Sequence, residues 1–302
     1  MKILLTGRNG QLGWELARTL APLGELAAYD RTMLDLAKPD QIAAAVRSVK
    51  PDIIVNAGAY TAVDKAESEP EAAFAVNAVA PGLLAEEAKR AGALLIHYST
   101  DYVFDGAKEM PYVEEDPHNP LNVYGRSKLA GELAVQSVDG SHLILRTSWV
   151  YAARGRNFFL TIRRLLKEKS ELRVVSDQIG APTSARALAE ATAELLRRHG
   201  VAALRGARGV YHVTAAGFTS WHGFATEIAR LERPNPLVRI IPIASSEYPT
   251  PAPRPKNSRL SNEKLRRSFG IALPQWETCL ETCHAGLKRS GRVDTGIRRS
   301  GL

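Results

Sequence analysis

The segment Tyr124-Gly125-Arg126-Ser127-Lys128 places a phenol and an ammonium four residues apart, in a stretch that is typical of the start of a helix. Residues at positions i and i+4 lie on one face of a helix, so the two side chains are expected to be neighbours. A cation beside a phenol favours the phenolate and makes the phenol a better acid and base. We therefore interpret Tyr124 and Lys128 as a catalytic pair that moves a proton to or from a carbonyl or alcohol oxygen.

A hydroxyl group joins this pair from a predicted strand. Residues 93–98 form a short apolar run, and Thr100 follows where that strand is expected to end. Ligands of open α/β sheets bind at the carboxyl ends of the strands. Thr100 is therefore the third predicted catalytic residue, because its hydroxyl can hydrogen-bond a substrate oxygen or tune the Tyr124 proton.

A glycine-rich loop near the N-terminus indicates a dinucleotide cofactor. Residues 7–13 read Gly-Arg-Asn-Gly-Gln-Leu-Gly and lie between a predicted strand at 2–6 and a predicted helix at 11–20. Glycines in such a loop allow a tight turn, a close approach of the backbone to a pyrophosphate, and close packing of helix and strand. The N–H groups of the helix N-terminus then face the phosphates. The loop residues predicted to bind the cofactor are Gly7, Gly10, Gln11, Leu12 and Gly13.

The residues after the second strand bear on the choice of cofactor. Asp30 ends that strand, where an acidic residue usually binds the adenosine ribose, and this favours NADH. Arg31 follows it and Arg8 lies in the glycine loop, so either guanidinium could bind the 2′-phosphate of NADPH. The choice between NADPH and NADH stays open at this point. Further residues predicted to line the cofactor are Asp35, Leu36, Ala59, Tyr60 and Thr61.

The elements that must position these residues alternate along the first half of the chain. Apolar strands separated by helices are typical of a parallel sheet that helices cover on both faces. We predict an α/β fold with a doubly wound parallel sheet (Rossmann) and a smaller C-terminal substrate-binding lobe. The predicted strands are 2–6, 25–29, 52–56, 93–98 and 142–146, and the predicted helices are 11–20, 41–49, 71–91 and the one that carries Tyr124.

The second half of the chain predicts a looser organisation. Helices are expected at 157–169 and 184–198 and a strand at 209–214, and seven prolines between 232 and 258 exclude long regular elements there. We expect a second lobe built on loops and short helices. The predicted division is 1–150, with 170–215, for the NAD(P)-binding domain, 151–169 and 216–285 for the substrate-binding lobe, and 286–302 for a basic, disordered tail.

Bulk composition narrows the function classes. The 302 residues carry a net charge of +8, and residues 285–302 supply +4 of it, so the remainder is only mildly basic. An anionic small substrate explains that charge as well as nucleic acid does, and no motif of a nucleic-acid-binding module is present. No apolar run approaches the roughly 20 residues of a membrane helix, and no signal peptide is recognisable. We expect a cytoplasmic protein that binds neither nucleic acid nor membranes.

The two cysteines, Cys279 and Cys283, are expected one turn apart on a helix near the C-terminus. Two cysteines in a cytoplasmic chain do not predict a disulfide framework. Together with His284 they could suggest a metal site, but packing residues on a helix are the better interpretation. No metal-binding residue is predicted.

Longer motifs accompany the glycine loop along the chain. They are Asn-Ala-Gly-Ala-Tyr-Thr-Ala-Val-Asp-Lys-Ala-Glu (56–67), His-Tyr-Ser-Thr-Asp-Tyr-Val-Phe (97–104), Leu-Asn-Val-Tyr-Gly-Arg-Ser-Lys (121–128), Arg-Thr-Ser-Trp-Val-Tyr (146–151), Asp-Gln-Ile-Gly-Ala-Pro-Thr (177–183) and Pro-Arg-Pro-Lys-Asn-Ser-Arg-Leu (253–260). With these motifs the chain resembles the extended short-chain dehydrogenase/reductase family, and the later motifs resemble its reductase branch. The resemblance covers about residues 1–285.

The resemblance implies a reaction and roles for the residues. The implied reaction is reduction of the C4 ketone of dTDP-4-dehydro-L-rhamnose to dTDP-L-rhamnose, with NADPH or NADH as hydride donor. Tyr124 would protonate the C4 oxygen, and Lys128 would bind the nicotinamide ribose and lower the Tyr124 pKa from about 10 toward about 7. Thr100, Asp101 and Trp149 would contact the dTDP-sugar. Related dehydratases carry Asp-Glu after the Thr, and Tyr102 in place of the second acid favours simple reduction.

Two other functions stay open. One is reduction of another 4-keto nucleotide sugar. The other is a non-catalytic, cofactor-binding regulatory subunit of the methionine adenosyltransferase type, which the presence of Thr100, Tyr124 and Lys128 together opposes. Some relatives form Mg²⁺-dependent dimers, so a homodimer and Mg²⁺ are left open, but no Mg²⁺ ligand can be placed in this sequence.

Overall fold

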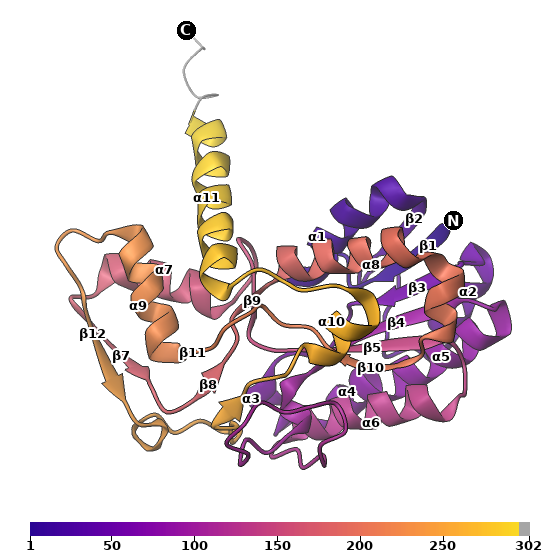
Figure 1. Cartoon of the computed structure of the whole chain (residues 1–302), viewed down its shortest axis with the longest axis horizontal. Coiled ribbons are helices and arrows are strands. Elements are labelled where there is room, and N and C mark those ends of the chain that lie inside the picture. Colours follow the sequence, from indigo (N-terminus) through magenta and orange to yellow (C-terminus); the bar gives the residue numbers. More distant parts are fainter. Residues whose placement is uncertain (296–302) are drawn as a thin grey trace, which may run out of the picture.

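A six-stranded sheet dominates the computed structural model, which describes residues 1–295. Every strand pairing in it is parallel, and the strand order is β10-β5-β4-β3-β1-β2 (Figure 1). The chain first builds outward from β1 to β2 and then restarts on the other side at β3, so the switch point lies between β1 and β3. The strands are β1 (Lys2–Thr6), β2 (Glu25–Tyr29), β3 (Ile53–Asn56), β4 (Leu94–Thr100), β5 (His142–Thr147) and β10 (Gly209–His212).

Alternate side chains of these strands face two separate apolar cores. Leu4, Ile54 and Leu95 belong to one core, whereas their sequence neighbours Leu5 and Val55 belong to the other. Strands that are buried on both faces require helices on both faces, and this confirms the predicted doubly wound fold. One side carries α2 (Pro39–Val49), α5 (Ala80–Ala91) and α6 (Val123–Ser137), and the other carries α1 (Gln11–Leu20) and α8 (Ala185–Gly206).

Two predicted helices differ in detail from the structure. The helix expected over 71–91 is divided into α4 (Pro70–Phe74), a π-helical turn, η2 (Ala75–Val79), and α5, and it ends at Gly92 as predicted. The helix expected over 184–198 runs on as α8 with a kink at Gly200. Periodicity could not reveal the π turn, because one extra residue per turn barely changes a short, Ala-rich pattern.

The second lobe contains more strand than we expected. β7 (Glu171–Val175) pairs in parallel with β12 (Arg239–Ile243), outside the large sheet. The sequence predicts that residues 170–215 belong to the NAD(P)-binding domain. Within that range, α8 and β10 belong with the large sheet, but β7 does not. β12 contains Pro242 and lies in the proline-rich range that argued against regular elements, and β7 carries charged residues at alternate positions instead of a continuous apolar run. The other elements of this lobe are α7 (Phe158–Glu168), β8 (Ile179–Gly180), β11 (Thr219–Ser220), α9 (Trp221–Glu232), η4 (Ser245–Glu247) and β13 (Asn257–Ser258).

The remaining elements are short helices and strands between those already named, and the two C-terminal helices. They are η1 (Ala21–Leu23), α3 (Val63–Ala66), η3 (Asp101–Val103), β6 (Val150–Tyr151), β9 (Thr183–Ser184), α10 (Glu263–Phe269) and α11 (Trp276–Thr295). In Figure 1, the C-terminal part of α11 projects away from both lobes. Residues 286–295 of the predicted tail are therefore helical instead of disordered, and 296–302 lie outside the described residues.

The two cysteines occupy the relative positions that the sequence predicted. Cys279 and Cys283 lie one turn apart on α11 as free thiols. Within residues 1–295, no helix combines the length and the apolar character needed to cross a membrane.

A buried ion pair fastens α6 to the sheet. Glu132 of α6 and Arg146 of β5 approach to 2.6 Å, and neither side chain is more than 1% exposed. Arg146 also donates to the Glu114 carbonyl oxygen and to the His118 ring, so its guanidinium is held from several sides. Because α6 also carries Tyr124 and Lys128, this pair helps to set where the predicted catalytic side chains lie.

Glu132→Gln should destabilise the protein strongly, because it leaves the Arg146 guanidinium buried without its counter-charge. We expect the free energy of unfolding to fall by about 3–5 kcal/mol in urea titrations. The control is Glu86→Gln, which breaks an exposed pair with Arg90 at 3.5 Å and should cost about 1 kcal/mol or less. Equal losses in the two variants would contradict this account.

Candidate active site

The carboxyl ends of four neighbouring strands form the edge on which the predicted residues meet. The sheet register places Thr6 beside Asn56, Asn56 beside His97, and Thr100 beside Thr147. The segments that follow β1, β3, β4 and β5 therefore leave the sheet at one edge. These segments contain the glycine loop, residues 57–61, Asp101 and Trp149, as the sequence predicted for a ligand-binding edge.

Two side chains fix the start of α6, the helix that carries the predicted catalytic pair. Asn122 Oδ1 accepts a hydrogen bond from the Gly125 N–H at 2.8 Å, and Glu67 Oε1 accepts one from the Val123 N–H at 2.7 Å. Both carboxamide and carboxylate oxygens satisfy N–H groups that have no partner within a helix. Tyr124 and Lys128 consequently lie in successive turns of one helix, as predicted.

The Tyr124 phenol is hydrogen-bonded to Thr100 and lies edge-on to the Tyr102 ring, with centroids 5.5 Å apart. Burial raises the pKa of Tyr124 to about 12, and the bond to Thr100 offsets only part of that rise. The expectation that the pKa falls toward 7 relied on Lys128 and a bound nicotinamide; in the protein by itself, burial and the Asp101 charge raise the pKa instead, and no lowering by Lys128 contributes. A phenol in this state is protonated at neutral pH, as a proton donor must be.

Thr100 and Asp101 form the end of β4 that faces the phenol. Thr100 Oγ1 donates to Asp101 Oδ1 at 3.1 Å and accepts from the Tyr102 N–H at 3.2 Å. Among the described residues, Asp101 Oδ2 has no hydrogen-bond partner although it is buried. Burial raises the pKa of Asp101 to about 6, against hydrogen bonds from the Ser258 and Thr100 hydroxyls. A buried acceptor without a partner is suited to receive a hydroxyl from a ligand.

The Lys128 ammonium is held by a backbone carbonyl oxygen of β4. The side chain is buried, and Nζ donates to the Tyr98 carbonyl oxygen at 2.6 Å. Burial lowers the pKa of Lys128 to about 8, and the charge of Glu132 opposes that shift. Lys128 is therefore able to change its protonation state near neutral pH.

Asn77, which the sequence did not single out, connects the cofactor side of the site to α6. It lies in the π turn η2, where its side chain bonds both the N–H and the carbonyl of Tyr60 and donates to the Ser127 hydroxyl at 3.0 Å. π turns are frequent at functional sites because they re-aim one side chain. The only signal in the sequence was a polar residue in the otherwise apolar, Ala-rich run 72–85.

The glycine loop has the shape that a bound pyrophosphate requires. Gly7 has φ +73°, and a Cβ there would lie 2.6 Å from the Gly58 nitrogen. A Cβ on Gly13 would lie 2.0 Å from the Gly7 carbonyl oxygen, so only glycine lets α1 pack this closely. No side chain caps α1 and no acid lies in its first turn, so the N–H groups of Gln11 and Leu12 face outward without a competing anion. These features fit a dinucleotide.

The predicted adenosine-side residues line the ends of β2 and β3. The Asp30 carboxylate accepts hydrogen bonds from the Thr32 hydroxyl and N–H and from the Asn9 amide, and these bonds, led by Thr32, lower its pKa. Arg31 is exposed, and its guanidinium lies 4.0 Å from Asp35. The ionised Asp30 keeps lone pairs for a ribose hydroxyl. Leu36 is buried beside Gly58, and Ala59, Tyr60 and Thr61 follow β3 on the same edge.

Trp149 lies at the junction of the two lobes. Its backbone has a φ of +48°, and its ring stacks on Trp221 of α9 with centroids 3.5 Å apart. Its other neighbour is Gly180, where a Cβ would lie 2.5 Å from Trp149 Cε2. A left-handed backbone at a large residue is costly and recurs at functional sites. Among the described residues, its ring partners come from the small lobe and not from the Tyr124 cluster.

An ion pair joins the small lobe to α3, the short helix that follows β3. Arg254 Nη2 donates to Asp64 Oδ2 at 2.8 Å, and the Ala252 N–H donates to Asp64 Oδ1 at 3.2 Å. Asn122, which caps α6, also donates to the Pro253 carbonyl oxygen at 2.8 Å. The sequence pointed to this segment only as part of the motif 253–260, with no role for Arg254.

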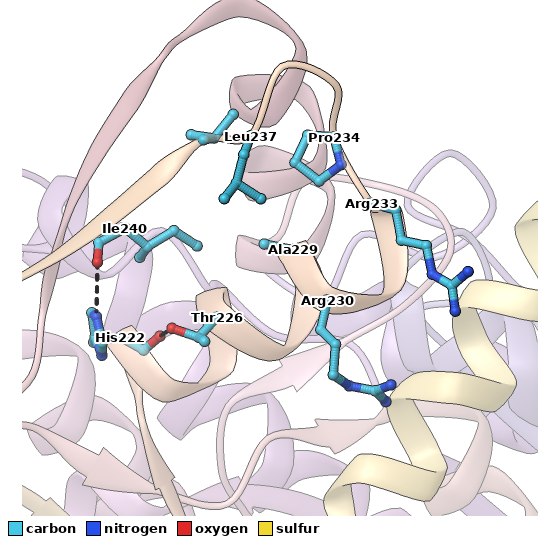
Figure 2. Close-up of a pocket in the computed structure, with 9 residues that line it drawn as sticks. His222, Thr226, Ala229, Arg230, Arg233, Pro234, Leu237 and Ile240 are labelled. Carbon is cyan, nitrogen blue, oxygen red and sulfur yellow. Dashed lines mark hydrogen bonds between the residues drawn. The ribbon is translucent and has the colours of Figure 1, made fainter.

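A cavity of about 550 Å³ lies elsewhere, between α9 and the segment that leads into β12 (Figure 2). None of the predicted site residues lines it, so it is separate from the catalytic cluster. It is lined by His222, Thr226, Ala229, Arg230, Arg233, Pro234, Leu237, Val238 and Ile240. Within residues 1–295, no group of three or more His, Cys, Asp or Glu side chains is arranged to hold a metal ion.

Known proteins resemble this chain over nearly its whole length. It is 53% identical over 291 residues to dTDP-4-dehydrorhamnose reductase of Burkholderia thailandensis, covering 94% of this chain and 98% of that protein. It is 50% identical over 286 residues to dTDP-4-dehydrorhamnose reductase of Escherichia coli, covering 92% and 95%.

Solved structures and a family model agree with these relatives. The crystal structure of dTDP-4-dehydrorhamnose reductase from Bacillus anthracis in complex with NADP matches with a TM-score of 0.88 at 36% identity, covering 94% of this chain and 99% of that one. The model of the family described as RmlD substrate binding domain matches residues 1–289. The protein therefore belongs to the RmlD substrate binding domain family.

Proposed function

We propose that this protein reduces the C4 ketone of dTDP-4-dehydro-L-rhamnose to dTDP-L-rhamnose, with a nicotinamide cofactor as reductant. The observation that carries the proposal is the cluster of Thr100, Tyr124 and Lys128 at the sheet edge that also holds the glycine loop. Its relatives at about half identity are named as reductases of that keto sugar, which supports the choice of substrate.

The protein's own groups supply the proton and the orientation. The nicotinamide cofactor, when bound, supplies the hydride that goes to C4. Tyr124, protonated at neutral pH, donates its phenolic proton to the C4 oxygen as the carbonyl becomes an alcohol. The Thr100 hydroxyl and the Lys128 charge stabilise the phenolate that remains. Tyr102 occupies the place of a dehydratase's second acid, so no second carboxylate is present there for elimination.

Substrate and cofactor are held by different parts of the edge. Asp101 Oδ2, the buried acceptor, would take a hydrogen bond from a sugar hydroxyl. Trp149, backed by Trp221, would contact the sugar nucleotide where the lobes meet. The glycine loop would hold the pyrophosphate and Lys128 the nicotinamide ribose. We propose that Asp30 and Arg31 together allow both NADH and NADPH to bind.

The direct test combines purified protein, the keto-sugar nucleotide, and NADPH or NADH. We expect cofactor absorbance to fall and NMR of the product to show the 4-hydroxyl with the configuration of rhamnose. A different product would identify another 4-keto sugar as the natural substrate. Absence of any cofactor oxidation would sink the proposal and favour a binding-only role.

Tyr124→Phe should cut kcat by about 10²–10⁴-fold, because it removes only the proton donor. Cofactor affinity, measured by quenching of tryptophan fluorescence, should stay within about twofold of wild type. Tyr211→Phe is the matched control, because Tyr211 lies on the edge strand β10 and its hydroxyl donates to the Ala207 carbonyl oxygen. Wild-type turnover in Tyr124→Phe would remove the phenol from the mechanism.

Asp101→Asn should change stability in a pH-dependent way. The folded protein binds the Asp101 proton more tightly than the unfolded chain does, since the pKa is raised to about 6. This group therefore makes folding less favourable as pH rises from about 4 through 6. Relative to wild type, we expect the variant to be equally stable near pH 4 and more stable at pH 8 by up to about 3 kcal/mol. Urea titrations at the two pH values measure this, and a constant difference would contradict it.

Arg31→Ala should separate the two cofactors. Loss of a charge-assisted bond to the 2′-phosphate should raise KM for NADPH by about tenfold. KM for NADH should change less than about twofold, because NADH lacks that phosphate. Arg126→Ala, an exposed arginine on α6, is the control. Equal effects on the two cofactors would show that Arg31 does not read the phosphate.

A further inference from the structure

Three adjacent strands contribute a continuous row of buried polar side chains beneath the catalytic edge. Thr6 of β1, Asn56 of β3 and His97 of β4 are paired neighbours in the sheet register, and none is more than 1% exposed. The row ends at Lys128 of α6, whose Nζ lies 3.5 Å from His97 Nε2. Burying several polar groups together costs free energy unless each one has a hydrogen-bond partner. The order of donors and acceptors along the row therefore matters.

A backbone N–H at one end sets the direction of the row. The Gly58 N–H donates to Thr6 Oγ1 at 3.3 Å, and Thr6 Oγ1 donates to Asn56 Oδ1 at 2.6 Å. The Asn56 amide nitrogen, 3.0 Å from His97 Nδ1, must then be the donor to that ring nitrogen. The reverse order would leave the Thr6 hydroxyl proton without an acceptor among the described residues.

This order dictates the form of the His97 ring. Because Nδ1 accepts a hydrogen bond, the imidazole is neutral and carries its proton on Nε2. Burial, reinforced by the nearby Lys128 charge, lowers the pKa of His97 well below its usual value, in agreement with a neutral ring. The Nε2–H therefore faces the Lys128 nitrogen. A charged ammonium would meet this N–H donor with another donor, whereas a neutral amine would accept it.

The other charged and polar groups described around Lys128 come from α6, β4, β5 and η2. Tyr124 and Glu132 lie one turn before and after it on α6, and Glu132 is itself paired with Arg146 of β5. The Tyr98 carbonyl oxygen of β4 accepts from Nζ, and Asp101 lies beyond the end of β4. From η2, Asn77 contributes a neutral side chain. His97 is thus the group whose proton directly opposes a charge on Lys128.

We propose that His97, oriented through Asn56 and Thr6, is a positioning residue that favours the neutral amine of Lys128 and so sets the pH at which Lys128 loses its proton. The equilibrium is Lys128–NH₃⁺ to Lys128–NH₂ with one proton released, and the amine lone pair then accepts the His97 Nε2–H. Its catalytic meaning rests on the proposed function, in which the Lys128 charge stabilises the Tyr124 phenolate. The protonation equilibrium itself exists without any substrate.

The first measurement uses the unmodified protein. ¹⁵N NMR of histidine-labelled protein, with His97 assigned by the loss of its signals in His97→Gln, reports which ring nitrogen is protonated. We expect the neutral ring with the proton on Nε2 between pH 6 and 9. A proton on Nδ1, or a charged ring, would overturn the proposal regardless of how any variant behaves.

The second measurement follows the Lys128 titration. Glutamine reaches the position of Nε2 and can turn its carbonyl oxygen to the ammonium, so His97→Gln should stabilise the charged form. We expect the Lys128 pKa, read from ¹³Cε NMR, to rise by about one unit or more. His142→Gln is the matched control, because the His142 ring is also on a strand but bonds the Gly140 carbonyl oxygen. An unchanged Lys128 pKa in folded His97→Gln would contradict the proposal.

The kinetic consequence is separable from the proposed function. If the protein reduces the keto sugar, the alkaline limit of kcat should move up with the Lys128 pKa in His97→Gln. Absence of reduction in the wild-type protein would refute the proposed function and leave the NMR result on His97 and Lys128 standing.

Discussion

The buried ammonium of Lys128 is the group around which the rest of the site is arranged. A lysine end removed from water is unfavourable unless neighbours compensate for the lost hydration. Here the Tyr98 carbonyl and, one helical turn away, the Glu132 carboxylate are those neighbours, whereas the His97 Nε2–H opposes the charge. Glu132 is buried in turn and requires Arg146, so the charge on α6 is tied to β5. The balance leaves Lys128 able to titrate near neutral pH.

Burial also sets the protonation state of the Tyr124 phenol. Removal of Tyr124 from water raises its pKa more than the Thr100 hydroxyl lowers it, so the protein alone keeps the phenol protonated. That state suits reduction, in which a proton must be given. Asp101 is affected in the same direction and keeps one oxygen without a partner among the described residues. Near pH 7 the Tyr124 phenol is therefore neutral, whereas Asp101 and Lys128 each lie within about one pH unit of the pKa at which they change charge.

The small lobe contributes its own side chains and backbone groups to the ligand-binding edge of the large sheet. Arg254 and the Ala252 N–H bind Asp64, Pro253 binds the cap of α6, and Ser258 bonds Asp101. Trp221 supports Trp149 in a backbone conformation that is unfavourable for a large residue. Side chains that are separated by more than a hundred residues therefore share one polar network, which gives the two lobes a common geometry at the site.

Much of the fold and part of the site were predictable from local pattern. The apolar strands, the glycine turn, the start of a helix near Tyr124 and the spacing of Tyr124 and Lys128 depend on residues that are near one another in sequence, so periodicity and turn chemistry reveal them. β7, β12 and the π turn were missed, because β12 lies in a proline-rich segment, β7 lacks a continuous apolar run, and one π turn barely changes the pattern of an Ala-rich helix.

The sequence by itself determined the doubly wound class and the glycine loop, and it singled out the side chains that we propose to be catalytic. Only the tertiary structure decided what surrounds them. His97 meets Asn56 and Lys128, and Asp64 meets Arg254, through contacts that span 31 to 190 residues. Such contacts follow from strand order and register, which place distant residues side by side. The protonation states of Tyr124, Asp101 and Lys128 depend on that burial, and burial is a property of the assembled fold.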